Sequence, residues 1–343
     1  MSTSPILRKL EALDAVLVGT QHLLVVMQNY PDPDALAAAA ALRELARSRG
    51  VHGVSVASGG ELGRAENRAL ARYLRLNLEN LDLLDLTRFD RLAMVDTQPR
   101  TGNNALPPDA VPHIVLDHHP LRQATRAATF YDVRRTYGAT CTLLYEYLTA
   151  AKVELQPILI TGLVYGIRSD THDLGRDTSR ADIAALVALY PRADHRALGA
   201  IQAAKTPRSY FHAIARALVS ARVYGDTILS FMGEIETPDI VGELADLLLR
   251  DEKSAWTLVY GVFDDRLLLS LRTSERQRDA GQIMHRLVDG LGTGGGHNAM
   301  AGGQIPLPED SPARRAQLEA ELKRRLLRAL HIRDRKGVPL IQT

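Results

Sequence analysis

An alternation of short apolar runs with helical patterns is the feature that most constrains the fold. Residues 22–28 form a valine-rich apolar run, typical of a buried strand. Asp34 follows it and can cap the helix expected over 35–49, which Gly50 would end. Similar strands are expected at 51–58, 91–97 and 113–119, and helices at 138–151, 156–168, 179–190 and 194–204. Such an alternation predicts an α/β fold, with a mostly parallel sheet covered by helices on both faces.

The pattern changes near residue 205 and predicts a second, smaller α/β unit. Its elements are a helix over 207–222, a strand over 227–235, a helix over 238–250, a hairpin that turns at Asp264 and Asp265, and a helix over 279–290. An Arg-rich amphipathic helix is expected over 309–333, with its charges on a solvated face. We assign a first domain to 1–205, a helical linker to 206–225 and a second domain to 226–343, since the chain is long enough for about two domains.

Composition excludes several classes of protein. Lys and Arg number 42 against 40 for Asp and Glu, and the net charge of +2 argues against a protein that binds long duplex nucleic acid. The single cysteine, Cys141, excludes an internal disulfide framework and Cys-rich zinc modules. No apolar stretch is long enough to span a membrane, and the first residues lack the apolar region of a signal peptide. We therefore expect no membrane partner and a cytoplasmic location.

Acidic and histidine side chains follow the ends of the predicted strands. Asp32 and Asp34 follow the first strand, Asp96 closes another, and Asp117, His118 and His119 close a third, while Asp170 follows the helix at 156–168. Taken singly, each acid is more typical of a turn or a helix cap. Ligands of open α/β sheets bind at the carboxyl ends of strands, so we expect these side chains to converge.

Converging carboxylates repel one another unless a cation compensates their charge. Mixed carboxylate and imidazole ligands suit manganese, with magnesium, cobalt and iron as competitors. Two such ions about 3.5–4 Å apart are the usual solution for phosphoester hydrolysis. The pattern therefore predicts a divalent-metal site of one or two ions.

In this order, the motifs resemble those of the DHH phosphoesterase family. Its first four motifs are similar to residues 31–39 (PDPDALAAA), 95–97 (VDT), 116–120 (LDHHP) and 165–176 (YGIRSDTHDLGR). Residues 293–303 (TGGGHNAMAGG) look like the signature of the DHH-associated domain of one branch, which includes RecJ-like enzymes, nanoRNases and phosphatases of 3′-phosphoadenosine 5′-phosphate. The resemblance implies two lobes with the active site in the cleft between them.

The resemblance also implies roles for individual residues. Asp34, Asp96, His118 and Asp170 would hold one metal ion, and Asp32 with Asp96 would contribute to a second, which makes Asp96 the bridge. His119 would bind the scissile phosphate or donate a proton. Asp117 would orient a histidine.

One position departs from the family pattern. The first motif normally begins with a histidine three residues before the Pro-Asp-Pro-Asp run, and Gln28 stands there. An amide oxygen is a weaker manganese ligand than imidazole. We hypothesise that this part of the site binds its metal weakly, fills only with substrate, or stays empty.

The glycine run is a candidate for substrate binding. An exposed loop of Gly294, Gly295 and Gly296 can bring backbone N–H groups close to a phosphate or carboxylate, and His297 follows it. Arg272, at the end of an apolar strand, could add a guanidinium for a phosphate or a base edge. An ordinary flexible turn and a surface arginine are the alternative readings from the residues alone.

The leading hypothesis is a metal-dependent phosphodiesterase or phosphatase of small nucleotides. The resemblance implies short single-stranded oligoribonucleotides, linear or cyclic dinucleotides and 3′-phosphoadenosine 5′-phosphate as substrate classes, and it also points to a homodimer. Gln28 leaves open a nucleotide-binding regulatory protein that has lost most hydrolysis. A third reading is an inorganic pyrophosphatase, against which the glycine-rich second lobe argues.

Overall fold

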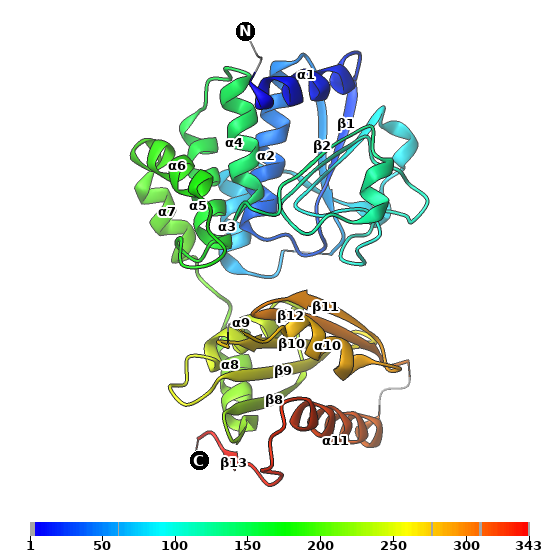
Figure 1. The fold of residues 1–343 in the computed structure, drawn as a ribbon, viewed down its shortest axis with the longest axis vertical. Helices are drawn as coiled ribbons and strands as arrows, with labels where there is room; N and C mark the ends of the chain where they lie inside the picture. Colours follow the sequence, from blue (N-terminus) through cyan, green and yellow to red (C-terminus); the bar gives the residue numbers. More distant parts are fainter. Residues whose placement is uncertain (1–3, 61, 276, 309–310, 342–343) are drawn as a thin grey trace. The chain divides into compact units, whose positions relative to one another are not determined.

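The computed structural model describes residues 4–60, 62–275, 277–308 and 311–341, in two compact units (Figure 1). The first unit comprises Met1–Lys205 and the second Thr206–Thr343. Within the described residues, no helix combines the length and the apolar character that crossing a bilayer requires.

Six parallel strands form the sheet of the first unit. The order across the sheet is β3 (Leu78–Asn80), β2 (Gly53–Ser58), β1 (His22–Val26), β4 (Arg91–Val95), β5 (Ile114–Asp117) and β6 (Phe130–Val133). The chain extends the sheet from β1 to β3 in one direction and then returns to place β4 on the other side of β1. The neighbouring strands β1 and β4 therefore form the switch point at which α/β sheets bind ligands. The predicted α/β class and parallel sheet are confirmed.

Different elements pack on the two faces of this sheet. Leu23 and Val25 of β1 join a core with the α-helices, whereas Leu24 and Val26 join a second core on the opposite face. This second core is completed by loops and short 3-10 helices, so the prediction of helices on both faces is wrong in that detail. The 3-10 helices on that face include η1 (Leu81–Leu83) and η2 (Leu86–Arg88), and η3 (Gln123–Ala127) links β5 to β6. Figure 1 shows α2 and α4 on one side of β1 and β2, with the loops on the other.

The helices of the first unit pack on the first core. They are α1 (Pro5–Leu17), α2 (Pro33–Ser48), α3 (Ala65–Tyr73), α4 (Thr140–Ala150), α5 (Pro157–Asp170), α6 (Arg180–Leu189) and α7 (His195–Gln202), with the 3-10 helix η4 (Tyr190–Arg192) after α6. The alanine-rich α2 contacts both α4 and α5. At Gly166 of α5 a Cβ would lie 2.6 Å from Cys141 Sγ and 3.2 Å from Pro33 O. Small residues thus allow three helices to meet directly behind the carboxyl end of β1.

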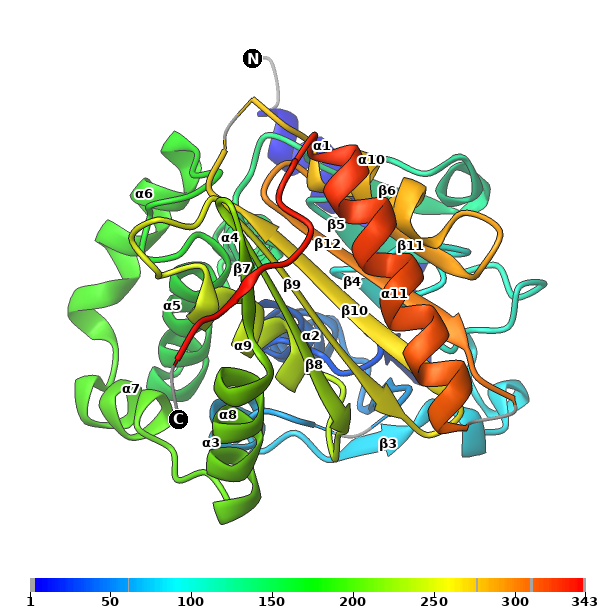
Figure 2. The ribbon, with the colours of Figure 1, turned by 90° about the horizontal axis from the view of Figure 1, so that it is seen from below.

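The second unit is built on a mixed sheet of seven strands. Their order is β11 (Thr293–His297), β12 (Met300–Pro306), β10 (Arg266–Thr273), β9 (Trp256–Phe263), β8 (Thr227–Glu234), β7 (Arg222–Tyr224) and β13 (Val338–Pro339). Only β8 and β9 pair in parallel, and the predicted turn at Asp264 and Asp265 joins β9 to β10. One face packs on α8 (Arg208–Ser220) and α9 (Ile240–Leu248), and the other on α10 (Ala280–Val288) and α11 (Pro312–Ala329). Figure 2 shows α11 lying across its face of this sheet.

Two expectations for the second unit differ from the structure. The segment 206–225, expected as a linker, belongs to the second unit, because α8 buries Ala213 and Ala217 against the core that contains Ile228 of β8. The glycine run, expected as a loop, is the edge strand β11, paired antiparallel with β12. Its glycines have a packing reason, since a Cβ at Gly294 would lie 2.8 Å from Met284 Cγ of α10.

Candidate metal centre

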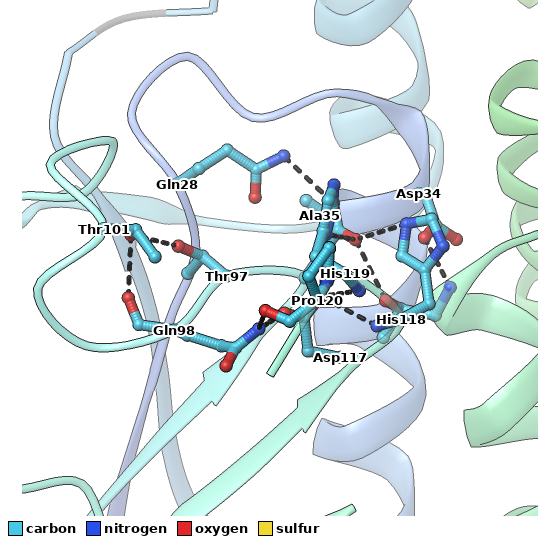
Figure 3. Close-up of polar contacts among 12 residues, drawn as sticks. Gln28, Asp34, Ala35, Thr97, Gln98, Thr101, Asp117, His118, His119 and Pro120 are labelled. Atoms are coloured by element: carbon cyan, nitrogen blue, oxygen red, sulfur yellow. Dashed lines mark hydrogen bonds and ion pairs between the residues drawn. The ribbon is translucent and has the colours of Figure 1, made fainter. Parts of the chain in front are cut away.

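The acids and histidines predicted from the strand ends converge at the switch point of the first sheet. Figure 3 shows Asp34, Asp117, His118 and His119 grouped there, with the amide of Gln28 beside them. One ligand atom from each of Asp34, His118 and Asp170 lie within 4.8 Å of one another, and the same is true of Asp96, His118 and His119. Side chains from separate stretches of sequence thus share one site.

Asp32 and Asp34 enter the site from the start of α2. Asp32 caps this helix by accepting a hydrogen bond from Ala35 N at 2.9 Å. Asp34 is fully buried and accepts hydrogen bonds from Thr140 N at 2.6 Å and Cys141 N at 2.9 Å, the first amides of α4. Burial and then the charge of Asp170 raise the pKa of both carboxyls, to about 7 for Asp32. A helix N-terminus therefore orients a carboxylate that burial alone would disfavour.

Asp96 follows β4 in a left-handed backbone conformation with φ 57°, which non-glycine residues seldom adopt. Its Oδ1 accepts from Thr140 Oγ1 at 2.9 Å, and its Oδ2 accepts from Gln28 Nε2 at 3.0 Å. Burial, with repulsion from Asp32 and Asp34, holds the pKa of Asp96 well above its usual value. Backbone strain at this point is consistent with a functional site.

His118 directs one ring nitrogen into the carboxylate cluster. Its Nδ1 lies 3.1 Å from Tyr137 O and donates to it, so in the neutral ring the lone pair is on Nε2. Nε2 lies 3.1 Å from Asp170 Oδ2 and 3.5 Å from Asp96 Oδ1. It is buried, and among the described residues it makes no well-directed hydrogen bond. A lone pair that faces two carboxylates needs either a proton or a metal cation between them.

The same cluster sets the ionisation of His118 and Asp170 when no cation is present. Burial lowers the pKa of His118, but the close carboxylate of Asp170, followed by the charges of Asp96 and Asp34, outweighs it and leaves the pKa well above its usual value. The pKa of Asp170 is lowered, because the contacts with His118 outweigh its burial. A proton on His118 is thus the substitute for a metal ion.

His119 is held by a buried carboxylate. Its Nδ1 lies 2.9 Å from Asp117 Oδ1, which also accepts from the backbone amides of His118 and His119. Gln98 Nε2 donates to Asp117 Oδ2 at 2.6 Å. Burial raises the pKa of Asp117, but the hydrogen bond from His119 and the other contacts outweigh it, so the pKa is lowered. The His119 side chain is 42% exposed, so part of the ring faces solvent.

Gln28 occupies the position at which the family pattern has histidine. Its amide nitrogen donates to Asp96, and its Oε1 is buried with no hydrogen-bond partner among the described residues. In this orientation the amide N–H occupies one oxygen of Asp96, the residue expected to bridge two ions. One candidate donor set combines Asp34, His118 and Asp170, and a second combines Asp96, His118 and His119. The oxygen and imidazole donors of both sets suit a divalent cation.

Three supporting residues were missed from the sequence. Thr140 contacts two of the acids, Tyr137 offers its carbonyl to His118, and Gln98 holds Asp117. The only sequence signal for Thr140 was its place at the start of the helix expected over 138–151. Nothing local indicated Tyr137 or Gln98, because their partners come from distant strands.

The residues expected to bind substrate lie in the second unit. Gly294, Gly295 and Gly296 are part of edge strand β11, which ends at His297, whose side chain lies outside the described structure. Arg272 is on β10, and its Nε donates to Asp246 Oδ1 at 2.8 Å. Both assignments stay predictions.

Fold and site together define a class, the two-unit α/β proteins with a carboxylate–histidine cluster at the switch point of a parallel sheet that could hold a metal ion. The DHH family N-terminal domain matches residues 23–167, and the DHHA1 domain matches residues 225–324. The chain therefore contains a DHH family N-terminal domain and a DHHA1 domain, as the resemblance of its motifs predicted. Members of the DHH family are phosphoesterases.

Similar proteins extend this picture. An uncharacterized protein of Methanocaldococcus jannaschii is 33% identical over 320 residues, which is 91% of this chain, and the chain spans 65% of that protein's length. An exopolyphosphatase-related protein from Bacteroides fragilis has a TM-score of 0.75 at 13% identity, over 96% of this chain and 99% of that one. RecJ from Thermus thermophilus, solved in complex with Mn²⁺, has a TM-score of 0.55 at 15% identity, over 97% of this chain and 56% of that one. At such identities, the two solved structures establish a shared fold.

Proposed function

We propose that this protein is a divalent-metal-dependent phosphoesterase that hydrolyses phosphoester bonds of small nucleotides. The observation that carries the proposal is the buried Nε2 of His118, which faces Asp96 and Asp170 without a hydrogen-bond partner among the described residues. Asp34, Asp96, His118 and Asp170 would hold the ion, with Asp32 at the margin of the site. When bound, a cation supplies charge neutralisation for phosphoryl oxygens and acidifies water.

The protein's own side chains hold the reacting groups in place. Tyr137 O selects the His118 tautomer, and Thr140 with the first turn of α4 orients Asp34 and Asp96. Asp117 binds Nδ1 of His119 and thereby leaves Nε2 of the ring to contact a phosphate oxygen or to donate a proton to a leaving group. We assign this role to His119 and the orienting role to Asp117.

The substrate classes we propose are short oligoribonucleotides, linear or cyclic dinucleotides and 3′-phosphoadenosine 5′-phosphate. Manganese is the proposed ion, in line with the mixed oxygen and nitrogen donors. A net charge of +2 favours short substrates over long phosphate tracts. In the second unit, the backbone of Gly294–Gly296, His297 and Arg272 are the proposed contacts for the nucleotide. A homodimer and a cytoplasmic location complete the proposal.

The test is an assay of the full chain against these compounds and inorganic pyrophosphate, with Mn²⁺ and with EDTA. We expect hydrolysis of at least one nucleotide, its loss in EDTA and a loss of at least about a hundredfold in Asp96→Asn. Asp90→Asn is the matched control, because Asp90 closes the turn before β4 and bonds to the amides of Gln21 and His22 outside the centre. Turnover of pyrophosphate alone, or of nothing while metal is bound, would contradict the proposal.

A second candidate function rests on the hydrogen bond between Gln28 and Asp96. If this contact prevents a complete metal set, the protein binds nucleotides as a sensor or regulatory subunit. Tight nucleotide binding without product, unchanged by excess Mn²⁺, would favour that function over the enzyme.

A further inference from the structure

The second unit carries a basic pocket that the metal centre does not use. It has a volume of ≈ 470 Å³ and opens beside the C-terminal half of α11. The residues that line it are Lys323, Arg324, Leu327, Arg328 and Arg335. Leu327 is buried beneath the cationic side chains, and no acidic residue is among those that line the pocket.

The pocket lies in the most basic segment of a nearly neutral chain. Residues 312–336 contain nine Lys and Arg side chains and three Asp and Glu side chains, a surplus of six positive charges. The whole chain has a net charge of +2, so the remaining residues carry a net charge of −4. The positive charge is therefore concentrated here rather than spread evenly over the surface.

Nearby acids neutralise only one of the cationic side chains that line the pocket. Glu321 bonds to Arg324 and Arg325, and Arg325 also donates to the carbonyls of Leu287 and Asp289 at the end of α10. The carboxylate of Asp334 accepts from the amides of the turn that follows it. In the part of the chain that the structure describes, Lys323, Arg328 and Arg335 have no carboxylate at ion-pair distance, so three cationic groups remain available to a ligand.

Tyr224 holds the two sides of the pocket together. Lys323 Nζ lies 5.9 Å from the centroid of its ring. Gly337, with φ 61°, packs on the same ring, where a Cβ would lie 2.5 Å from Tyr224 Cε1. Arg222 Nη2 donates to Gly337 O at 3.0 Å and fixes the turn that carries Arg335.

The end of α11 turns the chain toward this site. His331 adopts φ 59°, and Ile332 N bonds to Leu327 O at 2.8 Å, which ends the helix in a left-handed cap. The chain then returns to pair β13 with β7, as Figure 2 shows. The backbone around the pocket is thus set before any ligand arrives.

We propose that this pocket binds the phosphate chain of a small polyanion with at least two phosphate groups, such as a nucleoside polyphosphate or an inorganic oligophosphate. Guanidinium groups match phosphate oxygens in paired hydrogen bonds, and several converging cations need several negative charges. Tyr224 already contacts Lys323 and Gly337, so the pocket offers no ring for stacking a base. Its residues are absent from the metal centre, so this site is separate from the proposed activity.

The test is calorimetric titration of the full chain in EDTA with tripolyphosphate, ATP and adenosine. We expect tripolyphosphate and ATP to bind and adenosine not to bind. Arg328→Gln and Arg335→Gln should each weaken binding about tenfold. Arg314→Gln, at the other end of α11, is the matched control and should leave binding unchanged. No binding of tripolyphosphate, or equal losses in the control, would overturn the proposal.

Comparing the affinities of several ligands distinguishes an inorganic oligophosphate from a nucleotide. Equal affinity for tripolyphosphate and ATP supports an oligophosphate chain, and tighter ATP binding supports a nucleotide. Much tighter binding of a short single-stranded RNA, with steep salt dependence, would overturn a small-anion site. Asp96→Asn should keep polyphosphate binding and lose hydrolysis, whereas Arg328→Gln should lose polyphosphate binding and keep hydrolysis. A failure of this proposal can therefore be distinguished from a failure of the proposed function.

Discussion

Thr140 is the residue through which the sequence-distant acids of the centre are aligned. Its amide binds Asp34 and its hydroxyl binds Asp96, so one residue orients two predicted metal ligands. Groups that orient metal ligands typically contribute about 10–100-fold to affinity. Residues of this kind are invisible to pattern analysis, because their contacts span a large part of the chain.

We predict that Thr140→Val weakens Mn²⁺ binding about tenfold or more, because the valine removes the hydroxyl and keeps the shape. Thr140→Ser should restore most of the affinity. Calorimetric titration of the metal-free protein measures this directly. Thr161→Val is the control, since its hydroxyl donates to Pro157 O within α5. An affinity unchanged in Thr140→Val would show that the Thr140 hydroxyl does not orient a metal ligand.

For Gln28→His we expect tighter binding of a second Mn²⁺ ion, because imidazole is a better manganese ligand than an amide. The variant also removes the amide N–H that donates to Asp96 in the wild-type chain. The measurement is the number of ions retained per chain after desalting, with hydrolysis rates alongside. If the wild-type chain already retains two ions, the hypothesis that Gln28 weakens this part of the site fails.

At the scale of elements, the buried carboxylate of Asp132 joins the edge strand β6 to α1 and α4. Asp132 accepts hydrogen bonds from Lys9 of α1 at 2.5 Å, Arg134 at 2.8 Å and Tyr147 of α4 at 2.9 Å. Burial raises the pKa of Asp132, but these donors outweigh it, so the pKa is lowered. Ionised Asp132 therefore stabilises the fold above the unfolded-state pKa of about 3.9, and this contribution is lost as pH falls below it.

We predict that Asp132→Asn lowers the free energy of unfolding by about 3 kcal/mol at pH 7, because it leaves the buried Tyr147 hydroxyl and the largely buried Arg134 without their charged partner. The difference from wild type should shrink as the pH falls below about 4. Urea denaturation at a series of pH values measures both effects. A difference that is constant with pH would show that the charge of Asp132 contributes nothing.

The edge strand β11 depends on glycine for its contact with α10. A Cβ at Gly294 would lie 2.8 Å from Met284 Cγ, whereas a Cβ at Gly295 has nothing within 4 Å. We predict that Gly294→Ala lowers the free energy of unfolding by about 1–3 kcal/mol through overpacking. Gly295→Ala is the matched control and should change it far less in the same urea titration. Equal effects of the two variants would contradict the packing role.

At the scale of the whole molecule, four carboxylates lie close together, namely Asp32, Asp34, Asp96 and Asp170. Because they repel one another, the free energy of unfolding should depend on a bound metal ion. An ion that binds only the folded state, present at about 100 times its Kd, adds about 2.7 kcal/mol. We predict a rise of this size with Mn²⁺ and its reversal by EDTA, measured by chemical denaturation. The gain should vanish in Asp96→Asn and persist in Asp90→Asn, and a gain retained in Asp96→Asn would place the ion elsewhere.

Local sequence patterns were sufficient to predict the α/β class, the parallel first sheet and the hairpin after β9. They also predicted that acids and histidines at the strand ends would lie together. Strand and cap signals depend on neighbours along the chain, and parallel strands bring their carboxyl ends to one edge. The tertiary structure alone decided the rest. It covered the second face of the first sheet with loops, made the glycine run a strand against α10, and bonded Gln28 to Asp96. It also brought Thr140 to Asp34, 106 positions away, because such contacts depend on how distant elements pack.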